Sequence, residues 1–120
     1  MNTHFKTFLC AFALVLIISI RVQAAGPAKN ETVVIQTSAV CDECKARIET
    51  ALKSLKGVES ASLNLKNKKI KVKYDANAVN PVQIRTAISK TGYDADDVKA
   101  DQAAFKGLPS CCQKPASAMK

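Results

Sequence analysis

The chain has 120 residues, with 18 Lys or Arg and 10 Asp or Glu, which gives a formal charge of +8. This length predicts one domain and excludes large enzymes with a separate dinucleotide-binding domain. The single His, at position 4, argues against His-based acid–base catalysis, and the low aromatic content (5%) argues against nucleic-acid modules that stack bases on aromatic rings.

Residues 1–24 have the pattern of a secretory signal peptide. Lys6 precedes an uncharged apolar run over residues 8–20, which is shorter than the roughly 20 residues that a membrane-spanning helix needs. The small residues before position 25 predict cleavage after Ala24; the alternative is an uncleaved anchor. Cleavage removes Lys6 and Arg21 from the +8 total and leaves +6. We therefore expect a periplasmic or otherwise exported protein without stable membrane insertion after cleavage.

The export prediction bears on the cysteines. The mature chain would keep four of them and no His: Cys41, Cys44, Cys111 and Cys112. Because exported proteins meet an oxidising compartment, a disulfide is an alternative for any pair of these thiols.

Residues 25–31 are predicted to be a linker, and the β-branched residues 32–37 a first strand. A one-sided helix follows, in which Cys44, Ile48 and Leu52 share the apolar face, and Gly57 terminates it.

Alternation of apolar and polar residues predicts a hairpin from strands at 58–65 and 69–74. Asn80 and Pro81 are typical of a helix start, and Gly92 closes this second helix. A weaker pattern around Val98 suggests a last strand within residues 94–100. The order β-α-β-β-α-β predicts an α+β, ferredoxin-like domain over residues 32–100, with a four-stranded antiparallel sheet and two helices on one face. Residues 101–120 form a tail, with a short amphipathic piece at 102–108.

The motif Cys41-Asp42-Glu43-Cys44 lies where the first strand meets the first helix. Two intervening residues let both sulfurs turn toward one point. The backbone N–H groups at the helix start favour a thiolate, the form that binds metal. Two sulfurs suit a two-coordinate soft ion such as Cu(I) or Hg(II). Zn(II) would need further ligands from Cys111 and Cys112, carboxylates or water.

The combination of this motif and this element order resembles the heavy-metal-associated domain family, which includes copper chaperones, modules of metal-transporting ATPases and the periplasmic mercuric-ion-binding protein. The resemblance rests on residues 40–44, on residues 55–58 before the hairpin, on residues 72–75, and on residues 88–94. It implies that Cys41 and Cys44 bind the metal and that Tyr93 lies in the loop beside it. Ser38, Ala39 and Val40 stand where the family usually has Gly-Met-Thr.

The adjacent pair Cys111 and Cys112 lies outside the part that resembles the family. A tail of this length either folds back toward the start of the first helix or extends away from the domain. We hypothesise that these thiols supply extra ligands or accept the metal during transfer. The alternatives are a disulfide or a tail without a metal role.

The predicted function is a non-enzymatic, monomeric carrier that holds one soft metal ion, Cu(I) or Hg(II) in preference to Zn(II) or Cd(II), and passes it to a transporter or to another metal-binding domain. Two alternatives use the same cysteines: a thiol–disulfide oxidoreductase and a domain with a structural disulfide. Five lysines on the hairpin suggest either docking to an acidic partner or a solvated sheet face; they are Lys66, Lys68, Lys69, Lys71 and Lys73. Nucleic acid is not an expected partner.

Overall fold

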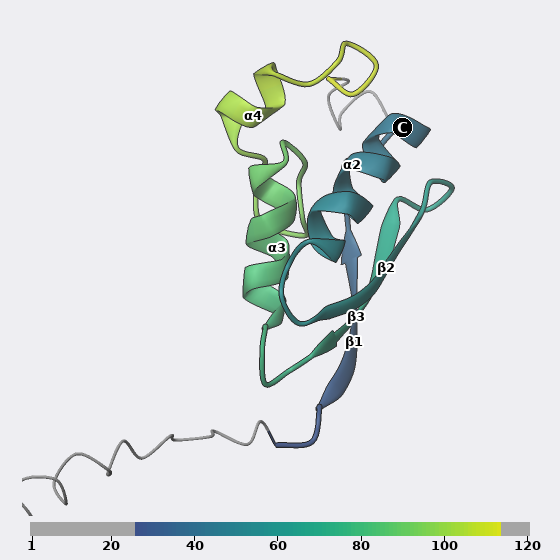
Figure 1. The fold of residues 1–120 in the computed structure, drawn as a ribbon. Coiled ribbons are helices and arrows are strands. Elements are labelled where there is room, and N and C mark those ends of the chain that lie inside the picture. Colours follow the sequence, from purple (N-terminus) through teal and green to yellow (C-terminus); the bar gives the residue numbers. More distant parts are fainter. Residues whose placement is uncertain (1–25, 114–120) are drawn as a thin grey trace, which may run out of the picture.

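The computed structural model describes residues 26–113 as a three-stranded antiparallel sheet with helices on one side (Figure 1). The strand order is β1-β3-β2. The elements in chain order are β1 (Asn30–Gln36), α2 (Asp42–Lys53), β2 (Val58–Asn64), β3 (Lys69–Asp75), α3 (Pro81–Lys90) and α4 (Gln102–Lys106). The predicted α+β class and the first five elements are confirmed. The predicted signal segment lies outside the described residues.

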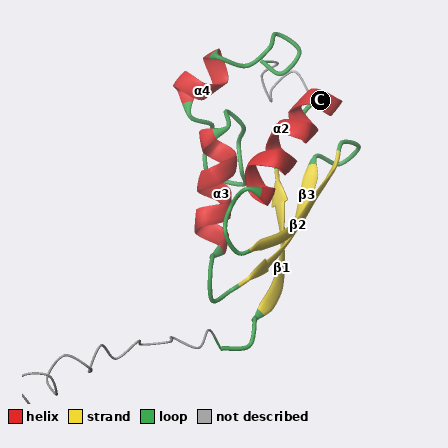
Figure 2. Ribbon diagram, viewed as in Figure 1, coloured by secondary structure: helices red, strands yellow, loops and turns green. Residues whose placement is uncertain are grey.

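The core lies between the sheet and the two long helices (Figure 2). In β3, Ile70, Val72 and Tyr74 are buried and alternate with exposed lysines. The central strand pairs Ile70 with Ile35 of β1 and with Leu63 of β2. Because side chains alternate across a strand, this register brings Ile35, Leu63 and Ile70 to the helix-facing side, whereas Val34 of β1 lies on the exposed face.

The helix boundaries follow local chemistry. Asn80 and Gln83 form a capping box at the start of α3, with hydrogen bonds of 2.9 and 3.0 Å, and Pro81 occupies the first turn. After α2, Gly57 adopts a φ of +96°, a conformation that is accessible to glycine and strained for other residues. The predicted helix ends are therefore confirmed to within a few residues.

The predicted fourth strand is wrong for the part of the chain that the structure describes. Only isolated bridges occur there, between Thr37 and Ala95 and between Ala95 and Val98. The reason is Asp96, which has a left-handed φ of +54° and accepts a hydrogen bond from the Gln36 N–H at 2.8 Å. The Asp96 side chain also pairs with Arg85 of α3 at 2.8 Å. The segment therefore turns at the sheet edge instead of extending along β1.

The N-terminal boundary also differs from the prediction. β1 begins at Asn30, inside the predicted linker 25–31, because Lys29 donates its backbone N–H to the Asp75 carboxylate at 3.0 Å and pairing with β3 starts there. Within residues 26–113, no helix has the length and apolar character needed to cross a membrane.

Candidate metal centre

Cys41 and Cys44 lie at the N-terminal end of α2. Cys41 is the N-cap residue with an extended backbone, and its carbonyl accepts the N–H of Lys45 at 3.1 Å. Cys41 is half-buried, whereas Cys44 is fully buried in the first turn. Their Sγ atoms are 3.1 Å apart and both thiols are free. The predicted convergence of the two sulfurs is therefore present.

The loop before Cys41 is fixed by side-chain hydrogen bonds. Thr37 Oγ1 donates to the Lys68 carbonyl at 3.0 Å and accepts the Ala39 N–H at 3.3 Å. Ser38 Oγ accepts the N–H of Asp94 at 2.9 Å, which ties this loop to the one after α3. Ala39 is fully buried, so it occupies the interior position for which the family uses a larger Met.

The tail folds back onto the same place. The Sγ atom of Cys41 is 3.6 Å from that of Cys112 and 3.9 Å from that of Cys111, and the two tail sulfurs are 3.8 Å apart. Cys111 is exposed and Cys112 is buried, with 2% of its surface accessible. The sequence left open whether the tail folds back toward the first helix or extends away from the domain. Residues 101–113 fold back and reach the start of α2.

Several contacts hold the tail in this position. Asp101 caps α4 by accepting the Ala104 N–H at 2.8 Å and donates its own N–H to the Ser89 carbonyl at 2.9 Å. Gly92 lies directly against α4, where an added Cβ would come 2.9 Å from the Phe105 nitrogen. Leu108 is buried, and the Gln113 side chain donates to its carbonyl at 2.6 Å. Residues 101–113 of the tail are thus packed against the domain, with α4 next to the end of α3 (Figure 1).

Tyr93 lies beside the cysteines, where the family resemblance implies it. Only 1% of its surface is accessible, and its hydroxyl has no hydrogen-bond partner among the described residues. Burial raises the pKa of Tyr93, and the thiols of Cys112 and Cys44 next to it raise it further. Burial likewise raises the pKa of the Cys112 thiol, with Cys44 the next cause. Burial therefore favours the neutral forms of the Tyr93 hydroxyl and the Cys112 thiol.

The sulfur distances can be compared with metal geometry. For a metal–thiolate bond of about 2.3 Å, sulfurs lie about 4.0 Å apart in a trigonal site and about 3.8 Å apart in a tetrahedral one. The triangle of Cys41, Cys111 and Cys112, with edges of 3.6, 3.8 and 3.9 Å, fits either arrangement. The 3.1 Å between Cys41 and Cys44 is shorter than both, so these two sulfurs must separate to share one ion.

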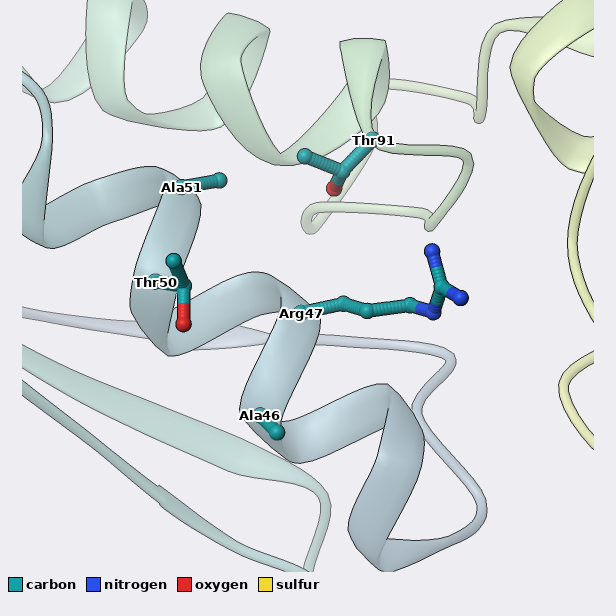
Figure 3. A pocket seen from close by; sticks show the side chains of 5 residues that line it. All are labelled: Ala46, Arg47, Thr50, Ala51 and Thr91. Carbon is teal, nitrogen blue, oxygen red and sulfur yellow. The ribbon is translucent and has the colours of Figure 1, made fainter.

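A separate groove lies between α2 and α3 (Figure 3). It has a volume of about 460 Å³ and is lined by Ala46, Arg47, Thr50, Ala51 and Thr91. Arg47 pairs with Glu43 of the same helix at 3.2 Å. Since no thiol lines this groove, it is not part of the metal centre.

The sequence pattern of the heavy-metal-associated domain family matches residues 29–94. The chain belongs to this family. The matched stretch contains Cys41, Cys44 and Tyr93 and ends before the tail cysteines. Over 54 residues the chain is 43% identical to the copper chaperone CopZ of Staphylococcus aureus (strain JH9), which covers 45% of this chain and 79% of that protein.

Two solved structures agree with this assignment. The CopZ metallochaperone is 35% identical, with a TM-score of 0.53, over 54% of this chain and 98% of that one. The water-soluble region of the P-type ATPase CopA from Bacillus subtilis is 33% identical, with a TM-score of 0.54, over 57% of this chain and 46% of that one.

The sequence located all four cysteines and Tyr93 as candidates, but it missed what positions the tail. The sequence pattern predicts only a helix terminator at Gly92, whereas in the structure this glycine also provides the space against which α4 packs. The signal that was available is the short amphipathic piece at 102–108, because its apolar face requires a surface to cover it.

Proposed function

We propose that this protein is an exported carrier that binds one Cu(I) ion through Cys41 and Cys44 and passes it on. The observation that carries the proposal is the pair of free thiols at the start of α2, placed within a heavy-metal-associated domain. Thiolates select soft ions over hard cations. Copper is favoured over Hg(II), Zn(II) and Cd(II) because the similar protein of Staphylococcus aureus is named a copper chaperone.

The position of the two thiols suits transfer by ligand exchange. Cys41 is partly accessible, so an acceptor thiolate can approach the ion from its side, whereas the buried Cys44 holds the ion from beneath. An ion with few ligands leaves room for the incoming sulfur, so a shared intermediate forms before the original ligands leave. This chemistry requires no catalytic group, and we propose a monomeric carrier and not an enzyme.

The proposed acceptor is a metal-binding domain of a transporter, since one of the similar structures belongs to a P-type ATPase. The exposed face of the sheet carries Lys69, Lys71 and Lys73, although Lys73 is paired with Glu59 at 2.8 Å. This face favours an acidic partner through electrostatic steering. Raising the salt concentration should therefore slow the encounter without changing the affinity for Cu(I).

The test is a Cu(I) titration of anaerobic, reduced protein against a chromophoric chelator. We expect one ion per chain in the wild type and none in the variant Cys41→Ser/Cys44→Ser. Retention of Cu(I) by this variant with unchanged affinity would overturn the proposed site. Parallel titrations with Hg(II) and Zn(II) establish the preferred ion. An insulin-reduction assay tests the oxidoreductase alternative, for which we expect no activity above that of free thiol.

Export is tested separately. Expression of the full chain in a Gram-negative host should yield a periplasmic protein whose N-terminal residue is Ala25, as read by mass spectrometry. An intact chain that begins at Met1 in the membrane fraction would overturn the cleavage proposal.

A further inference from the structure

Three sulfurs already stand in ligand geometry before any metal is present. Cys41 lies 70 residues before Cys111 in the chain, yet the Sγ atoms of Cys41, Cys111 and Cys112 form a nearly equilateral triangle. Three thiols do not gather at these distances unless the surrounding packing places them there. Two of the three come from the tail, beyond the part of the chain that matches the family pattern.

The packing of the tail is specific. Cys112 and Leu108 are buried, and the N–H of Cys112 donates to the Pro109 carbonyl at 2.8 Å in a tight turn that presents both cysteines. Gly92 permits α4 to approach the loop after α3, and the Gln113 side chain closes the turn through the carbonyls of Lys106 and Leu108. These contacts fix both tail cysteines beside Cys41.

The buried hydroxyl of Tyr93 indicates independently that Cys112 is a metal ligand. It is buried, it has no hydrogen bond of ordinary geometry within residues 26–113, and its neighbours are the neutral thiols of Cys112 and Cys44, whose sulfurs are only weak acceptors. A buried donor without an acceptor is rare in proteins. A thiolate on Cys112 would be the missing acceptor, and a thiolate forms there when the sulfur binds a cation.

We propose that Cys111 and Cys112 join Cys41 in a three-sulfur site that holds the cargo ion in a closed, storage state of the protein. This inference rests on the proposed function, in which Cys41 and Cys44 form the two-sulfur transfer state. Cys41 is common to both states. Each thiol that becomes a ligand releases its proton to solvent, and the ion keeps its oxidation state, so no oxidant or reductant takes part.

The two states explain how the ion is retained and then released. The tail thiols are attached to the same chain, so their effective concentration at Cys41 exceeds that of a free acceptor. An acceptor domain therefore has to displace the tail, and the ion then moves to Cys41 and Cys44 before it is transferred. The 3.1 Å separation of these two sulfurs agrees with a pair that is not the ligand set of the closed state.

The experiment counts sulfur ligands on Cu(I) by X-ray absorption in the anaerobic, reduced full chain. We expect three sulfur neighbours in the wild type and two, at a shorter mean bond length, in Cys111→Ser/Cys112→Ser. Competition with a chelator should show an affinity about tenfold lower or more in this variant. The variant Cys44→Ser should keep three sulfurs, because Cys44 is outside the closed set.

Two further variants separate a loss of metal ligands from a disturbance of the fold, because the double variant also changes the buried Cys112. Cys111→Ser alters only an exposed side chain, so it keeps the fold and should still lose the third sulfur. Ser110→Ala changes the neighbouring exposed residue and should leave both coordination and affinity unchanged.

Two sulfurs in the wild type, or three in the double variant, would overturn the inference. If the tail variants also leave the affinity unchanged while Cys41→Ser abolishes binding, the proposed function stands and only the closed state fails. A wild-type protein that retains no Cu(I) would overturn both.

Discussion

Removing the Tyr93 hydroxyl by Tyr93→Phe is predicted to stabilise the metal-free protein and to destabilise the metal-loaded protein. In the metal-free state, Tyr93→Phe removes a buried donor that has no acceptor among the described residues. Leaving such a group unsatisfied costs about 1–3 kcal/mol, so its removal should stabilise the metal-free protein by about 1 kcal/mol. In the loaded state the same hydroxyl would donate to a thiolate, and a hydrogen bond to a charged group contributes about 1.5–3 kcal/mol.

Because this hydrogen bond forms only when metal binds, its loss should appear as weaker binding. The lost hydrogen bond (about 1.5 kcal/mol or more) and the stabilised metal-free state (about 1 kcal/mol) both weaken binding, so we expect the affinity of Tyr93→Phe for Cu(I) to fall by about 70-fold or more, which corresponds to about 2.5 kcal/mol. Urea unfolding of the metal-free protein and chelator competition of the loaded protein measure the two effects.

The matched control is Tyr74→Phe. The Tyr74 hydroxyl donates to a Glu31 carboxylate oxygen at 3.2 Å, so its loss should destabilise the metal-free protein and leave the Cu(I) affinity unchanged. A Tyr93→Phe variant that is less stable without metal, or that binds Cu(I) as tightly as the wild type, would refute the reasoning.

Three further predictions concern the tail and the sheet edge. Gly92→Ala would place a Cβ on a residue with a φ of +98° and only 2.9 Å from the Phe105 nitrogen. We expect it to destabilise the protein by about 1 kcal/mol or more in thermal unfolding, and to make the tail thiols react faster with an alkylating reagent. Burial opposes ionisation of Asp96, but the Arg85 guanidinium and the Gln36 N–H lower its pKa below the ordinary 3.8. The ionised Asp96 carboxylate therefore stabilises the fold fully above pH 3.8, and this stabilisation is lost as the pH falls through the lowered pKa. Asp96→Asn should be less stable than the wild type at pH 7, and its free energy of unfolding should not show this loss when the pH is lowered. Finally, Cys111→Ser/Cys112→Ser should deliver Cu(I) to a dithiol acceptor faster than the wild type in stopped-flow absorbance, and an equal rate would show that the tail does not retain the ion.

The hairpin and the two long helices could be predicted because their patterns reflect burial on one side. Ile70 and Val72 alternate with lysines since β3 has one covered and one exposed face, and Ile48 and Leu52 recur at the helical period since α2 covers that face. Local sequence carries this information whatever the rest of the chain does. The family resemblance and the position of the Cys-x-x-Cys motif followed from the same local signals.

The conformation of residues 94–100, where a fourth strand was expected, could not be predicted from local sequence patterns. Residues 94–100 have no alternating pattern, and what decides their course is the pair formed by Asp96 and Arg85, together with the bond from the Gln36 N–H. These partners lie 11 and 60 residues away in the sequence. A conformation fixed by such distant contacts leaves little trace in local composition.

The course of the tail has a related cause. An adjacent pair of cysteines predicts neither a direction nor a partner, and one of the contacts that directs residues 101–113 is the close approach of α4 to Gly92. This glycine is needed after α3 in any case, where its positive φ closes the helix. The same residue therefore ends one helix and admits the next at close range. Because the residue that terminates α3 has no side chain, α4 can pack closely against it, and this packing contributes to the course that brings Cys111 and Cys112 to Cys41.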